Sequence, residues 1–222
     1  MKMEELGQNV GYLLYRTQAE WDADKERVRV IDGRDRMQLF VDGNFITTQY
    51  QTEIGQDIFV AAEKGTNHTI DILMENMGRV NYGHKLLADT QHKGIRTGVC
   101  KDLHFMLHWN QYPLEFKNPE VIDFTKEWHE DQPAFYAFDA ELKMLKDTYL
   151  DLTNFGKGIV FVNGVNIGRF WDVGPTLSLY IPHGLLRIGN NRIIIFETEG
   201  KYSKFIDLVH KPTFKPIKGD KL

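Results

Sequence analysis

The chain has 222 residues, of which 42% are apolar and 12% aromatic, so it can form the core of one large domain or of two small ones. Its formal charge of −4 and its isoelectric point of about 6.1 do not favour binding to nucleic acid or to an anionic membrane surface. The single cysteine, Cys100, excludes an intrachain disulfide and a cysteine metal cluster.

Targeting signals are not evident. Residues 1–5 lead into no apolar stretch, so no signal peptide is expected. No run approaches the roughly 18 apolar residues of a membrane-spanning segment. The start of the chain is also compatible with a piece of a longer protein, so the compartment stays open.

Short strand-like runs separated by turn residues cover the first half of the chain. Strands are expected at residues 10–16, around Val28 and Val30, and at residues 37–41, 54–61, 69–74 and 103–107. Residues 38–46 are expected to form a hairpin that turns at Asp42-Gly43. Residues 110–133 then combine three prolines with many charges, which indicates a domain boundary. Within that segment, the spacing of Val121, Phe124 and Trp128 predicts a short helix over residues 120–130.

The second half repeats the same kind of pattern. Strands are expected at residues 134–140, 148–152, 158–162, 165–171, 177–181 and 192–196. Asn163-Gly164 is the strongest hairpin-turn signal in the chain. Residues 201–222 carry many lysines and are expected to form a final strand with a loose tail.

The two halves also resemble each other. The run from Phe40 to Asn44 corresponds to the run from Phe161 to Val165, and residues 70–75 correspond to residues 192–197 at nearly the same offset. The alternative is that both runs are generic hairpin turns. The pattern predicts an all-β fold with two jelly-roll or galactose-binding-domain-like β-sandwiches in tandem, at residues 1–112 and 133–222, joined by a linker at residues 113–132.

A buried strand that ends in a polar loop stands out at residues 72–83, ILMENMGRVNYG. After the apolar residues come Glu75, Arg79, Asn81 and Tyr82, with Gly78 supplying backbone freedom. Amides and a guanidinium give directional hydrogen bonds, and an aromatic face covers the apolar side of a pyranose, so this inventory suits a sugar. The alternative is an irregular loop whose polar groups bind its own backbone and a neighbouring domain.

No catalytic set can be identified from spacing. A glycosidase needs two carboxylates, and none of the 31 acidic residues is distinguished as a pair. Glu75 and Glu197 end corresponding strands, and we expect them to bind backbone or arginine partners. The chain contains no HExxH, GxSxG or phosphate-binding loop, so no cofactor and no metal site are expected.

The amino-acid sequence resembles the carboxyl-terminal part of family-35 β-galactosidases. The resemblance covers nearly the whole chain in the same order and rests on MEELGQNVGYLLYRT, ENMGRVNYG, KGI, PAFYAFDA, DTYLDL, GKGIVFVNGVNIGRFWDVGPTLSLYIP and GNNRIIIFE. The family usually has Leu where Ile167 stands and Tyr where Phe170 stands. The resemblance implies a glycoside hydrolase of carbohydrate degradation, in which a catalytic TIM barrel precedes two β-domains of the galactose-binding type.

By this resemblance the chain begins after the barrel, which carries both catalytic glutamates of a retaining glycosidase. No catalytic residue is therefore expected here. Tyr82 is the best candidate to stack on the substrate sugar, and packing between domains is the alternative for this residue. Asn81 and Arg79 are expected at the same substrate site, where they hold the loop or the interface with the barrel. Glu75, Arg169 and Trp171 are expected at docking edges toward the barrel, although packing within the second module also accounts for Arg169 and Trp171.

Three hypotheses follow. The modules support the catalytic barrel and shape its mouth; or they form an autonomous module that binds terminal β-galactosides; or, least favoured, the chain is an enzyme by itself. The partners implied are the parent's barrel and β-galactosides, with no nucleic acid and no membrane. An aromatic surface that faces a barrel in the parent would be exposed here, so self-association is also expected.

Overall fold

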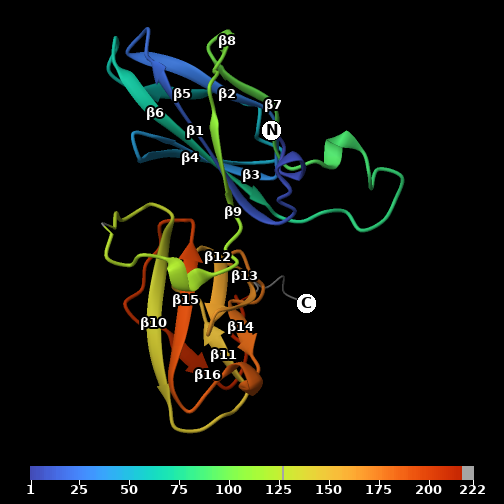
Figure 1. Ribbon diagram of the computed structural model, residues 1–222, viewed down its shortest axis with the longest axis vertical. Helices are drawn as coiled ribbons and strands as arrows, with labels where there is room; N and C mark the ends of the chain where they lie inside the picture. Colours follow the sequence, from blue (N-terminus) through green and yellow to red (C-terminus); the bar gives the residue numbers. More distant parts are fainter. Residues whose placement is uncertain (127, 217–222) are drawn as a thin grey trace. The chain divides into compact units, whose positions relative to one another are not determined.

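The computed structural model describes residues 1–126 and 128–216 and divides the chain into two compact units, Met1–Phe116 and Lys117–Leu222 (Figure 1). Both units consist of antiparallel strands and short 3₁₀ turns, which confirms the all-β class and the two β-sandwiches. The expected division at residues 112 and 133 stays a prediction. In the described part of the chain, no helix is long and apolar enough to cross a membrane.

The first unit is a sandwich of two antiparallel sheets. One sheet has the order β4-β3-β6-β1-β9 and the other β5-β2-β7-β8. The strand bounds are β1 Gly11–Glu20, β2 Lys25–Arg34, β3 Arg36–Val41, β4 Asn44–Tyr50, β5 Ile58–Ala61, β6 Asn67–Asn76, β7 Gly94–Lys101, β8 His104–Phe105 and β9 Asn110–Leu114. Short 3₁₀ turns lie at Glu4–Leu6 and Asp89–Gln91.

The second unit is built in the same way. Its sheets have the orders β10-β15-β12-β13 and β14-β11-β16. The strand bounds are β10 Ala134–Leu142, β11 Thr148–Asp151, β12 Lys157–Val162, β13 Val165–Trp171, β14 Ser178–Ile181, β15 Gly189–Glu197 and β16 Asp207–Val209. Further 3₁₀ turns lie at Pro119–Val121 and His183–Leu185.

Each sandwich encloses its own apolar core. In the first unit, Val28 and Val30 of β2 face Leu39 of β3 and Ile72 of β6 across the two sheets. In the second unit, Leu150 of β11 packs in the same cluster as residues of β12 and β15. Strand β2 shows why the sequence folds this way, because its buried residues alternate with partly exposed ones, as expected for a strand with one face on a core.

The internal repeat is confirmed by matching hairpins. Asp42 and Asn163 have φ angles of 51° and 49°, and each is followed by a glycine with positive φ. Their side chains accept backbone hydrogen bonds from Thr69 N (2.8 Å) and Arg192 N (3.0 Å). Both hairpins also shift register at corresponding points, between Leu39 and Phe40 and between Val160 and Phe161.

The expected alignment of the repeat is nevertheless wrong by one residue. Val41 pairs with Ile70, whereas Val162 pairs with Ile193, so Ile70 corresponds to Ile193 and not to Arg192. Glu197 therefore corresponds to Met74, and Glu75 and Glu197 are not equivalent. Because side chains alternate along a strand, this slip of one residue puts the two acids on opposite faces of their sheets.

The expected helix over residues 120–130 is also wrong. The described part of this segment holds only the 3₁₀ turn Pro119–Val121. The Asp123 side chain accepts hydrogen bonds from Thr125 N (2.9 Å) and Thr125 Oγ1 (2.6 Å), a local turn that competes with helical hydrogen bonding. Trp128 is 45% exposed, so no buried helical face forms. Residue 127 lies outside the described residues.

Strand bounds differ from the expectation at the end of the first unit. The expected strand at 103–107 is reduced to β8, and the longer β7 precedes it without having been expected. Two glycines and two basic residues weaken the strand signal of β7, but its pairing with β2 supplies the ladder that local propensity does not. The expected last strand is present as β16, whereas residues 217–222 of the expected tail lie outside the described residues.

Candidate functional site

Strand β6 carries the motif ENMGRVNYG to the edge of the first sandwich, where the chain leaves the sheet. The Asn76 amide donates to Asn9 O (2.8 Å) and accepts from Gly78 N (3.0 Å). Met77 N donates to an Asp35 carboxylate oxygen (2.8 Å). These hydrogen bonds fix the direction in which the following loop leaves the strand.

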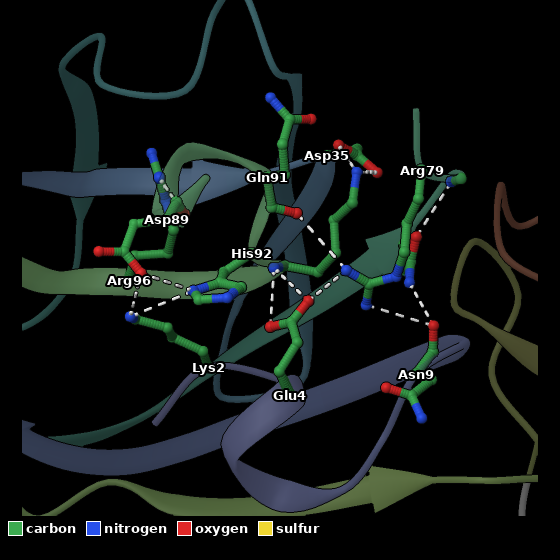
Figure 2. Close-up of polar contacts among 12 residues, drawn as sticks. Lys2, Glu4, Asn9, Asp35, Arg79, Asp89, Gln91, His92 and Arg96 are labelled. Carbon is green, nitrogen blue, oxygen red and sulfur yellow. Dashed lines mark hydrogen bonds and ion pairs between the residues drawn. The ribbon is translucent and has the colours of Figure 1, made fainter. Parts of the chain in front are cut away.

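Arg79 fastens the first part of this loop to the sandwich. Its guanidinium forms an ion pair with Glu4 and donates to Asn9 O (3.3 Å) and to Gln91 O (3.5 Å), as Figure 2 shows. The Glu4 carboxylate also accepts from Lys93 N (3.0 Å). We call Glu4, Asn9, Arg79, Gln91 and Lys93 the loop anchor, because they join both ends of the loop to the sandwich.

The loop anchor stabilises the charged form of Glu4. Burial acts to raise the pKa of this carboxyl group, but hydrogen bonds from the backbone and from Arg79 outweigh burial, and the pKa lies below its ordinary value of 4.5. At neutral pH the Glu4 carboxylate is ionised, so the charge-assisted bonds to Arg79 are present.

Two further ion pairs lie beside the loop anchor. Lys93 Nζ donates to both carboxylate oxygens of Asp35 at 2.7 Å, and both side chains are nearly buried. Arg36 and Glu75 pair at 3.0 Å between Nη1 and Oε2, with side chains 0% and 1% exposed. Glu75 is therefore excluded from solvent, on the face of β6 opposite Met74 and the apolar core.

The far end of the loop is exposed. Residues 80–88, which we call the outer loop, hold Val80, Tyr82, Leu86 and Leu87 with exposed fractions of 45%, 85%, 44% and 92%. Asn81 is also exposed. Figure 1 shows this segment projecting from the first unit between β6 and β7. The loop is thus joined to the sandwich at its ends and presents apolar side chains at its middle.

The structure separates the residues that the sequence grouped together. Arg79 uses its donors at the loop anchor, Asn81 and Tyr82 lie on the outer loop, and Glu75 is buried. The geometry favours a positioning role for Arg79. The sugar-contact roles of Tyr82, Asn81 and Arg79 and the docking role of Glu75 stay predictions.

In the second unit, Arg169 and Trp171 lie on β13 and share one face of that strand. Arg169 is exposed, and Trp171 is partly buried beneath Lys157 Nζ, which is 4.7 Å from the indole centroid. The contact with Lys157 favours a packing role for Trp171. Docking by either residue stays a prediction.

The expectation for the two strand-end acids is confirmed. Glu75 binds an arginine, and Glu197 accepts backbone hydrogen bonds from Gly156, Lys157, Glu199 and Lys201 at 3.0–3.2 Å. Burial raises the pKa of Glu197 despite these hydrogen bonds. Within the described residues, no group of three or more His, Cys, Asp and Glu side chains is placed to hold a metal ion.

Sequence reasoning missed the residues that hold the loop. Glu4, Asp35, Arg36 and Lys93 are distant from residues 72–83 in the sequence, and none of them was expected near this loop. One signal was available. Glu4 lies in MEELGQNVGYLLYRT and Lys93 lies in KGI, two of the motifs that carry the family resemblance.

Comparison with known proteins decides the family. The sequence model described as "Beta-galactosidase, first all-beta domain" matches residues 1–115, which include the whole loop anchor. The chain belongs to the β-galactosidase family. The model described as "Beta-galactosidase, galactose-binding domain" matches residues 133–191 of the same chain.

Individual β-galactosidases match across both units. Beta-galactosidase 17 of Arabidopsis thaliana is 31% identical over 91% of this chain and 33% of its own length. Beta-galactosidase 1 of Dictyostelium discoideum is 34% identical over 88% of this chain and 32% of its own length. The β-galactosidase of Xanthomonas manihotis is 33% identical, with coverages of 84% and 30%. The chain thus spans about a third of the length of these β-galactosidases.

Proposed function

We propose that this chain is the non-catalytic carboxyl-terminal part of a retaining β-galactosidase, where it supports the catalytic barrel and shapes the entrance to the substrate site. The two β-domains of the family and the match to about a third of each relative support this role. The observation that carries the proposal is the construction of the loop, with an anchored base and an exposed apolar outer part.

In this proposal the outer loop lies at the barrel mouth. Tyr82, at 85% exposure, stacks on the sugar that follows the cleaved bond, and Asn81 donates to its hydroxyl groups. Arg79 positions the loop through Glu4. Arg169 and Trp171 form a second docking edge on the other unit. Glu75 contributes to docking indirectly, through its buried ion pair with Arg36.

The first test is hydrolysis of a nitrophenyl β-galactoside by the purified chain. We expect no hydrolysis above the uncatalysed rate, because the catalytic glutamates belong to the barrel. Activity that co-purifies with the chain and disappears in one acid variant, such as Glu75→Gln, would identify the chain as an enzyme instead.

The second test uses the full-length parent enzyme. Tyr82→Ala is expected to raise KM for a β-galactosyl disaccharide by roughly tenfold, because an aromatic contact of about 1 kcal/mol and its buried area are lost. Tyr82→Phe keeps the ring and should leave KM unchanged. Equal KM values for the Ala variant and the unmodified enzyme would remove Tyr82 from the substrate site.

A second candidate function is galactoside binding by the chain without the barrel. It is supported by the match of residues 133–191 to the domain described as galactose-binding. A ligand-observed NMR titration of the chain with galactose and lactose tests it. Saturable binding supports this function, and no binding at millimolar sugar leaves the chain with the supporting role alone.

A further inference from the structure

A cavity of about 530 Å³ lies within the second unit, beside the edge strand β10. Its lining includes Asp123, Trp128, His129, Tyr136, Tyr202 and Lys204. The volume falls in the range of roughly 300–1,000 Å³ that is usual for small-molecule sites. The residues come from the segment before β10, from β10 itself and from the chain that follows β15.

Three aromatic rings form one wall of this cavity. The ring centroids of Trp128 and Tyr202 and those of Tyr136 and Tyr202 are each 5.2 Å apart, and Trp128 and Tyr136 are 6.2 Å apart. Trp128 Nε1 donates to the Tyr136 hydroxyl at 3.0 Å. Tyr136 is buried, whereas Trp128 and Tyr202 are 45% and 44% exposed, so the outer two rings present area to a ligand.

Polar groups of both hydrogen-bonding types lie around the aromatic wall. Asp123 supplies an acceptor, and hydrogen bonds from Thr125 keep the pKa of its carboxyl group below the ordinary value. Lys204 supplies donors, and neither Lys204 nor His129 has a hydrogen bond or ion pair to any residue that the structure describes. An amine and an imidazole are therefore available to a ligand.

We propose that this cavity is a saccharide-binding site that takes one pyranose residue, with its apolar C–H face on Tyr202 and Trp128 and its hydroxyl groups on Asp123 and Lys204. A pyranose has one apolar face and a rim of hydroxyl groups that both donate and accept, which matches this lining. An apolar peptide would cover the charged Lys204 amine without giving it a hydrogen-bond acceptor, at a cost in free energy that disfavours it.

The inference rests on the second candidate function and assigns it to one site, separate from the outer loop of the first unit. It requires no catalytic barrel. The supporting role of the chain is tested by the hydrolysis assay and by the KM of the Tyr82 variants. The result for this cavity therefore does not affect that proposal.

The experiment is a titration of the full chain with methyl β-galactoside, followed by ligand-observed NMR and by tryptophan fluorescence. Binding should be saturable and should change the emission of Trp128, a change that Trp128→Phe removes. Tyr202→Ala should weaken binding roughly tenfold through loss of the stacking face, whereas Tyr202→Phe should bind as the unmodified chain does. Lys204→Met should also weaken binding, because it removes the amine while all three aromatic rings remain.

Controls separate this site from others and from misfolding. Phe205→Ala removes a ring that is 78% exposed and does not line the cavity, so it should bind normally. Near-ultraviolet circular dichroism reports whether each variant keeps its aromatic packing. Binding that survives Tyr202→Ala and Lys204→Met but is lost in Tyr82→Ala overturns the site and leaves galactoside binding in place. The absence of saturable binding overturns both.

Discussion

The Arg36–Glu75 ion pair shows how single residues hold the end of β6. Both side chains are excluded from solvent, and the Arg36 guanidinium also lies 5.9 Å from the Tyr50 ring centroid. Removing two charges from water costs free energy, and the pair recovers this cost only while both partners are present. Loss of one partner leaves a buried charge without its counterion.

Arg36→Met is therefore expected to lower the free energy of unfolding of the first unit by about 3–5 kcal/mol. The control is Arg29→Met, because Arg29 pairs with Asp57 with side chains 41% and 31% exposed. Solvent screens that pair, so its loss should cost about 0–1 kcal/mol. Urea unfolding of both variants measures the difference, and equal losses would contradict a special role for burial.

The loop anchor should respond to acid through Glu4. The pKa of Glu4 is lowered in the folded chain, so its contribution to stability is present above its ordinary pKa of 4.5 and is lost as the pH falls through the lowered value. Hydrogen exchange of residues 77–92 should accelerate as the pH falls below about 4.5, relative to the intrinsic exchange rate at each pH. The Glu4→Gln variant should show fast exchange at every pH. A wild-type loop whose protection does not change with pH would refute the assignment to Glu4.

At the scale of elements, strand β12 depends on a close approach to β15. Gly158 pairs with Glu197 in this ladder, and a Cβ added at Gly158 would overlap the carbonyl oxygen of Phe196. The backbone of β15 belongs to a ladder on both sides, with β10 and β12, so it has little freedom to move away. Only glycine fits at position 158, because a side chain there would overlap the backbone of β15.

Gly158→Ala is expected to destabilise the second unit by about 3 kcal/mol or more, through overpacking against backbone. Gly184→Ala is the matched control, because nothing lies within 4 Å of a Cβ at that position. That change should be neutral or slightly stabilising. Differential scanning calorimetry measures both, and a Gly158→Ala chain that unfolds at the wild-type temperature would show that β15 can move.

At the scale of the whole molecule, the outer loop presents a group of apolar side chains to solvent. Val80, Tyr82, Leu86 and Leu87 are clustered in sequence and are all 44% exposed or more. In the proposed function the catalytic barrel covers Val80, Leu86 and Leu87, and the substrate sugar covers Tyr82. When the chain stands alone, the same surface is free to contact a second copy.

Self-association should therefore depend on the outer loop. A chain with Tyr82→Lys and Leu87→Lys should sediment as a monomer at concentrations where the unmodified chain forms larger species. Phe205→Lys replaces a residue that is 78% exposed on the other unit and should not change the distribution. Sedimentation velocity distinguishes these outcomes, and association that persists in the double variant would place the contact elsewhere.

Sequence determined most of the local structure, because hairpins and strands arise from short-range patterns. Asp42-Gly43 and Asn163-Gly164 adopt the expected turns, since these residues tolerate positive φ. The motif ENMGRVNYG marked the place where a buried strand becomes a loop, and the family motifs identified the class of protein. The helix expected over residues 120–130 failed because local hydrogen bonds of Asp123 compete with helical ones.

Only the tertiary structure decided which charges meet. Glu4 and Arg79, Asp35 and Lys93, and Arg36 and Glu75 are far apart in sequence, and the sheet order of the first sandwich brings them to one edge. The registers of β3 with β6 and of β12 with β15 likewise showed that Glu75 and Glu197 are not equivalent. Residue types and spacing specify turns and strand alternation, but the pairing of distant strands sets which side chains share a face.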